Sequence, residues 1–118
     1  LVSELAPREY LDYLKKNGIS YIAVGKKSID LREAVRILET EFGSQRIGVV
    51  GGGHINGSFL EAGLINEVSM VYGAGIDGRS SQPTAFEGIS ESHIVPYKLT
   101  LQSVEKVADQ SVWIRYTV

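Results

Sequence analysis

The chain has 118 residues, of which 22% are charged, with a formal net charge of −2 and no cysteine. A slightly acidic chain lacks the basic surface that attracts nucleic acid or an anionic membrane, so we expect neither as a partner. The lack of cysteine excludes a disulfide framework, thiolate metal ligands and a cysteine nucleophile, and it suits a reducing cytoplasm. No apolar run reaches the roughly 18 residues of a membrane span. Because Leu1 comes first, we expect a piece of a longer protein.

The N-terminal part of the chain predicts a helix, a strand and a second helix. The first helix is expected to start within residues 6–9, to carry its apolar face over residues 10–16 and to end at Gly18. Residues 19–24 are mostly β-branched or aromatic, which predicts a buried strand. Asp30 is a favoured N-cap, and the apolar residues after it recur at helical spacing, so a second helix is expected there.

The middle of the chain predicts two more strands and a third helix. A strand is expected over residues 47–50, a helix over residues 55–62 and a strand over residues 68–72. Short connections in this α-β-α-β-α-β order imply parallel strands with right-handed crossovers. Residues 73–88 are rich in Gly, Ser, Asp and Pro and predict a long irregular loop.

Two alternating runs close the chain. Residues 97–107 and 112–118 are joined by residues 108–111 (Ala-Asp-Gln-Ser), which predicts an antiparallel hairpin. We therefore expect residues 1–118 to form a single α/β domain: a mostly parallel sheet flanked by helices, with an antiparallel C-terminal hairpin.

Three consecutive glycines, Gly51, Gly52 and Gly53, stand where the second predicted strand enters a helix. Such a turn leaves backbone N–H groups at the positive end of the helix dipole, where a phosphate can bind. The Rossmann spacing fails because its third glycine would fall at Asn56, and no Gly-Lys-Ser/Thr follows to make a Walker loop. The alternative is a tight turn in which the glycines only permit close packing. Gly57 costs its helix about 1 kcal/mol against alanine, which favours a close contact there.

The side chains around the turn leave several alternatives open. His54 either is a solvated residue at the helix start or contacts a phosphate oxygen. Ser58 donates to the same anion or to a backbone carbonyl, and Asn56 faces either the sheet or the ligand. Lys26-Lys27 follows the first strand at the sheet edge where open α/β sheets bind ligands, and is either solvated or bound to phosphate. Elsewhere no nucleophile–base pair is legible, and His93 is expected at the surface.

The glycine run and its continuation resemble the pyrimidine-reductase domain of riboflavin biosynthesis, in the dihydrofolate-reductase-like superfamily. The resemblance rests on residues 49–53 (Val-Val-Gly-Gly-Gly) and residues 57–68 (Gly-Ser-Phe-Leu-Glu-Ala-Gly-Leu-Ile-Asn-Glu-Val). It extends through residues 73–78, residues 85–88 and the closing hairpin, and so covers nearly the whole chain. It matches only the C-terminal portion of the family domain, so the resemblance implies an incomplete domain.

The resemblance implies an NADPH-dependent reductase, a cytoplasmic homodimer that transfers hydride to a small heterocyclic or ribosyl-derived substrate. It places the cofactor on Gly51, Gly52, Gly53, His54, Ile55, Asn56, Gly57, Ser58 and Lys27. Val50 falls at a substrate-binding position where riboflavin-pathway reductases typically carry glutamate, and valine cannot hydrogen-bond a ribosyl hydroxyl, so the substrate stays open. The alternative function is a non-catalytic nucleotide-binding or oligomerisation module of the same fold, which Val50 favours.

Overall fold

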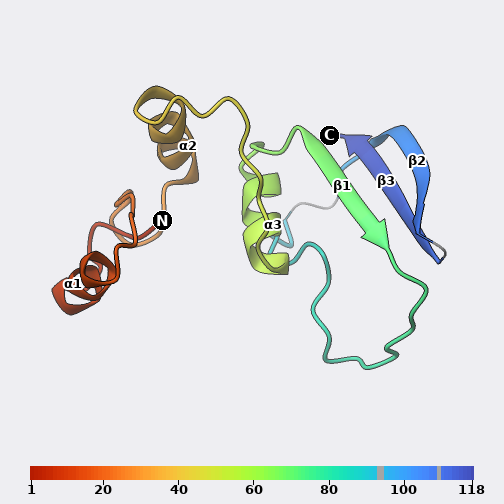
Figure 1. Ribbon diagram of the computed structural model, residues 1–118, viewed down its shortest axis with the longest axis horizontal. Helices are drawn as coiled ribbons and strands as arrows, with labels where there is room; N and C mark the ends of the chain where they lie inside the picture. Colours follow the sequence, from red (N-terminus) through yellow and green to blue (C-terminus); the bar gives the residue numbers. More distant parts are fainter. Residues whose placement is uncertain (93–94, 109) are drawn as a thin grey trace. The chain divides into compact units, whose positions relative to one another are not determined.

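A computed structural model of the chain describes residues 1–92, 95–108 and 110–118. The predicted surface residue His93 and the predicted turn residue Asp109 lie outside these ranges. Within the described residues, the chain forms three helices and three strands (Figure 1). None of these helices is long and apolar enough to cross a membrane.

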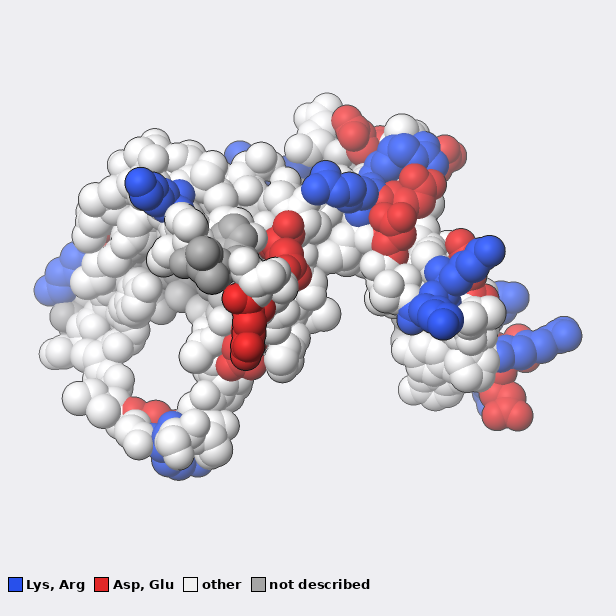
Figure 2. Space-filling view, turned by 180° about the vertical axis from the view of Figure 1, so that it is seen from behind, with Lys and Arg blue, Asp and Glu red and all other residues white. Residues whose placement is uncertain are grey.

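The first of two compact units spans residues 1–48 and contains helices α1 (Arg8–Lys16) and α2 (Leu31–Thr40). Both helices lie where the sequence predicts them. Gly18 follows the end of α1 with a φ of 66°, a left-handed conformation that glycine adopts without steric cost. Acidic and basic side chains are interspersed over the helices of this unit on the face drawn in Figure 2.

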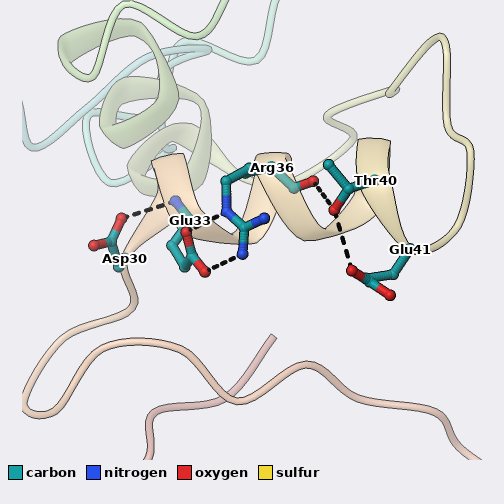
Figure 3. Close-up of polar contacts among 5 residues, drawn as sticks. All are labelled: Asp30, Glu33, Arg36, Thr40 and Glu41. Atoms are coloured by element: carbon teal, nitrogen blue, oxygen red, sulfur yellow. Dashed lines mark hydrogen bonds and ion pairs between the residues drawn. The ribbon is translucent and has the colours of Figure 1, made fainter.

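Local polar contacts hold α2 (Figure 3). The Asp30 carboxylate accepts the backbone N–H of Glu33 at 3.0 Å, satisfying one of the unpaired donors of the first turn. The Arg36 guanidinium donates to both carboxylate oxygens of Glu33, at 2.7 and 2.6 Å, and these bonds lower the pKa of Glu33. The Thr40 hydroxyl donates to the Arg36 carbonyl at 2.9 Å. The predicted Asp30 cap is confirmed.

We expect Asp30→Ala to lower the free energy of unfolding of the intact protein by about 1 kcal/mol, because the Glu33 N–H loses its acceptor. Denaturant unfolding followed by far-UV circular dichroism measures the change. Asp30→Asn keeps a side-chain oxygen at the same place and is the matched control, with a midpoint close to that of the wild type. A midpoint unaltered by the alanine would contradict the role of the cap.

The two strands predicted before the glycine run are not formed as strands. Residues 19–24 make one isolated parallel bridge, between Val2 and Ala23, and residues 47–50 have no strand assignment. A strand persists only where a neighbouring strand satisfies its N–H and C=O groups, and the described residues supply only the short stretch around Val2. The mostly parallel sheet is therefore not confirmed for this chain.

The second unit spans residues 49–118 and contains helix α3 (Gly53–Glu61) and strands β1 (Glu67–Tyr72), β2 (Thr100–Ala108) and β3 (Ser111–Thr117). The strand order is β1-β3-β2, and both pairings are antiparallel. The predicted C-terminal hairpin is confirmed as β2–β3. The predicted parallel pairing of β1 is not confirmed, because the one strand that pairs with β1 among the described residues is β3, which runs in the opposite direction.

The two faces of the sheet differ in chemistry. Val68 of β1 is buried, as are Phe59 and Leu60 of α3, and these side chains make the apolar core of the unit. Side chains alternate between the faces of a strand, so Ser69, the neighbour of Val68, points to the opposite face.

That opposite face carries a polar network. The Trp113 indole N–H donates to the Ser69 hydroxyl at 2.7 Å. The Arg115 guanidinium donates to both carboxylate oxygens of Glu67, at 3.0 and 2.7 Å, and lies 5.6 Å from the centroid of the Trp113 ring. The hydrogen bond to Glu67 raises the pKa of Arg115. The network ties β1 to β3 across the sheet.

Candidate functional site

The glycine turn forms the start of α3. The helix begins at Gly53, two residues before the predicted start at Ile55, and Gly52 is its N-cap with φ −77° and ψ −179°. No side chain among the described residues caps this end. Backbone N–H groups of the first turn are therefore left for another acceptor, which is the arrangement that binds anions in other proteins.

A segment further along the chain, residues 84–88, crosses the first two turns of α3; we call it the strap. The Glu87 N–H donates to the Gly53 carbonyl at 2.9 Å, and the Asn56 side-chain amide donates to the Ala85 carbonyl at 2.8 Å. Figure 1 shows the chain returning to α3 after the long loop that follows β1. One side of the glycine-led helix is therefore covered by the protein itself.

The strap requires two of the glycines. A Cβ added to Gly53 would lie 2.5 Å from the carbonyl oxygen of Thr84, and one added to Gly57 would overlap the carbonyl oxygen of Glu87. Close packing of the backbone leaves no room for either methyl group. The close contact predicted at Gly57 is confirmed, and its partner is the chain's own backbone.

Gly52 has a different environment, since nothing lies within 4 Å of a Cβ built on it. The neighbouring Val50 is 96% exposed and Ile55 is 52% exposed. A Cβ on Gly51 would lie 2.5 Å from the Cβ of Ile55, so Gly51 makes room for that side chain. The open side of the turn, where a ligand could reach the backbone, is therefore centred on Gly52.

His54 lies beside the strap. Its Nε2 is 3.5 Å from a carboxylate oxygen of Glu87, while the imidazole remains 79% exposed. The other Glu87 oxygen accepts the backbone N–H of Thr84 within the strap. Gly88 has a φ of 74°, and a Cβ on it would lie 2.7 Å from Nδ1 of His54. The ring is thus flanked at both nitrogens by residues of the strap.

The remaining predicted site residues divide between the two units. The Ser58 hydroxyl donates to the His54 carbonyl at 2.8 Å, which is one of the two alternatives left open by the sequence. Asn56 faces the strap, and its side-chain oxygen is buried with no hydrogen-bond partner among the described residues. Lys27 belongs to the first unit, where it is exposed in a loop, and its predicted cofactor contact stays a prediction.

Sequence reasoning singled out neither Glu87 nor the strap as part of the site. Two signals were available: residues 85–88 belong to the stretches that resemble the family, and a glycine inside α3, at Gly57, costs helix stability and so indicates that some other group comes close. The cost of Gly57 does not identify the strap as the group that approaches it. The composition of the strap predicts only an irregular loop.

The fold and the site define the chain as part of an α/β domain in which a glycine turn opens a helix beside an antiparallel sheet. The family model of the RibD C-terminal domain matches residues 1–113, and the chain belongs to this family. The resemblance identified from the glycine run is confirmed.

Over 109 residues the chain is 28% identical to the 2,5-diamino-6-ribosylamino-4(3H)-pyrimidinone 5′-phosphate reductase of Archaeoglobus fulgidus. The match covers 92% of this chain and 47% of that protein. The chain therefore spans about half the length of this curated relative.

Two solved structures share the fold. A pyrimidine reductase-like protein from Corynebacterium diphtheriae superposes with a TM-score of 0.76 at 18% identity, over 92% of this chain and 43% of that one. RibD from Acinetobacter baumannii superposes with a TM-score of 0.74 at 19% identity, over 90% of this chain and 28% of that one. The described architecture is thus that of part of a RibD-like domain.

Proposed function

We propose that the intact protein is an NADPH-dependent pyrimidine reductase of the riboflavin-pathway type and that the glycine turn binds a cofactor phosphate. Membership of the RibD C-terminal domain family and the reductase name of the curated relative support the reaction class. The observation that carries the cofactor proposal is the uncapped start of α3 at Gly52, where open space meets the positive end of a helix.

The residues present fit a phosphate in both charge and space. N–H groups of the first turn of α3 would donate to phosphate oxygens, and the exposed His54 imidazole would lie beside them. The strap would keep the turn rigid, so that a bound cofactor is oriented rather than loosely held. NADPH itself supplies the hydride when it is bound.

We propose that the substrate is a small heterocycle with a ribosyl-derived side chain, and that Val50 contacts it. The resemblance implies a substrate contact for Val50, and the exposed side chain of Val50 comes directly before the glycine turn. A valine there offers an apolar contact where a glutamate would hydrogen-bond a hydroxyl. We therefore expect a substrate whose hydroxyls are bound by other parts of the intact protein.

The test is NADPH oxidation by the intact protein, followed by absorbance, with a ribosylaminopyrimidinone 5′-phosphate as the first substrate. We expect consumption of NADPH that depends on this substrate. The absence of any NADPH binding would refute the proposal.

Binding of NADPH without turnover across pyrimidine and pteridine substrates would favour the second candidate, a non-catalytic nucleotide-binding or oligomerisation module. The apolar Val50 is the observation that favours it, since a lost hydrogen-bonding residue is expected where a substrate site has been given up. We also propose that the intact protein is a cytoplasmic homodimer, which sedimentation at several concentrations would check.

A further inference from the structure

The strap carries one half-buried acid beside the first turn of α3. We propose that this acid, Glu87, is a positioning residue, which locks the strap onto α3 and holds the His54 imidazole beside the glycine turn. The inference rests on the proposed function, because the groups that Glu87 orders are those that would meet the cofactor phosphate.

Three contacts converge on Glu87. Its backbone N–H donates to the Gly53 carbonyl at 2.9 Å, which anchors the strap to the first helical residue of α3. One carboxylate oxygen accepts the Thr84 N–H, which folds the strap back on itself. The other oxygen lies 3.5 Å from Nε2 of His54. The Glu87 side chain is only 28% exposed, so it is far more restricted than the 79% exposed imidazole that it contacts.

The two imidazole nitrogens of His54 face different residues of the strap. A carboxylate facing Nε2 favours the form with a proton on that nitrogen, as second partners of histidines commonly do. The other nitrogen, Nδ1, lies close to Gly88, because a Cβ built on Gly88 would be 2.7 Å from it. His54 thus has the Glu87 carboxylate at one ring nitrogen and Gly88 near the other, while most of its surface is open to a ligand.

The backbone contact and the side-chain contacts of Glu87 together position the strap against α3. The strap is hydrogen-bonded to Gly53 and Asn56 and lies directly against Gly53 and Gly57, so a displaced strap would remove these contacts from the first two turns of α3. Small displacements of a binding group reduce affinity steeply, because the binding geometry is no longer prepared before the ligand arrives. Loss of Glu87 should therefore weaken cofactor binding without altering the chemical step.

Two substitutions in the intact protein separate the contacts of Glu87. Glu87→Gln keeps an oxygen for the Thr84 N–H but removes the negative charge that faces His54, and Glu87→Ala removes both. We expect the Kd and the KM for NADPH to rise about threefold in the glutamine variant and about tenfold in the alanine variant, with kcat nearly constant. Direct binding by calorimetry and steady-state kinetics measure these values.

A double-mutant cycle excludes a merely structural effect. In a His54→Ala background, Glu87→Gln should no longer change the Kd, since the charge has lost its partner. The matched control is Glu61→Ala: the Glu61 carboxylate accepts the Ser90 N–H at 3.0 Å, at the other end of α3, and its loss should leave the Kd unchanged. An unchanged Kd in both Glu87 variants, or an equal effect of Glu87→Gln with and without His54, would overturn the inference.

A second readout does not depend on the cofactor. In the free protein, the NMR chemical shifts of the two imidazole nitrogens of His54 should report a proton on Nε2. Glu87→Gln should change these chemical shifts. If the wild type fails to bind NADPH, the proposed function is refuted, while these shifts still decide the contact. Identical shifts in the wild type and in the glutamine variant would overturn the positioning role by themselves.

Discussion

Gly52→Asp should raise the Kd of the intact protein for NADPH by about fivefold or more, whereas Gly52→Asn should raise it far less. Both side chains have nearly the same shape, and both would enter open space, since nothing lies within 4 Å of the position of a Cβ. The backbone of Gly52 is extended, with φ −77° and ψ −179°, which any residue can adopt. The two variants therefore differ in charge alone.

The sign of the effect follows from the position of Gly52 at the N-cap of α3. Aspartate and asparagine are both preferred N-cap residues, so neither variant should weaken the helix. The aspartate carboxylate would occupy the free N–H groups and repel a phosphate at close range by about 1 to 4 kcal/mol, depending on the local dielectric. About 1.4 kcal/mol corresponds to a tenfold change in Kd.

Titration calorimetry of the two variants, with their unfolding midpoints as the control for folding, decides this prediction. Equal NADPH affinity in Gly52→Asp, Gly52→Asn and the wild type would show that no phosphate lies at the start of α3. The reductase proposal would then need a different cofactor site.

Gly57→Ala should destabilise the intact protein, against the trend expected from its place in a helix. Helix propensity alone predicts a gain of about 1 kcal/mol when alanine replaces glycine inside a helix. The structure predicts the opposite, because the new Cβ would overlap the Glu87 carbonyl oxygen, an atom of the backbone that cannot rotate away. Overpacking of this kind costs about 1 to 3 kcal/mol or more, so a net loss is expected.

Denaturant unfolding of the intact protein measures this loss, and Gly52→Asn is the control. The control adds a side chain in the same motif but into open space, and asparagine is a favoured N-cap residue, so it should leave the strap contacts intact and should not lower the midpoint. A higher midpoint for Gly57→Ala than for the wild type would show that the strap does not lie against α3 in solution.

The local elements of the fold were predictable because their causes lie close together in the chain. The cap at Asp30, the helix end at Gly18 and the alternation that predicts the β2–β3 hairpin each depend on a few neighbouring residues. The strands predicted over residues 19–24 and 47–50 are not formed, because the cause of a strand does not lie in the neighbouring residues. Strand formation depends on a distant partner, and a β-branched run does not show whether that partner is present.

The candidate site was predictable only in part. The glycine run indicated a helix start that a ligand can approach, and Gly52 has the open surroundings which that interpretation requires. The same run also contains Gly53, whose missing Cβ makes room for Thr84. Open and strap-facing glycines look alike in a sequence, because both are read only as the absence of a side chain.

The sequence by itself determined where the three helices and the closing hairpin lie, and, through the glycine run and its continuation, the family. Those features depend on the order of neighbouring residues. Only the tertiary structure decided that β1 pairs antiparallel with β3 and that Glu87 comes against the first turn of α3. Both pairings join segments that are far apart in the chain. A local sequence pattern shows that a strand or a helix start needs a partner, but it does not show which distant segment is that partner.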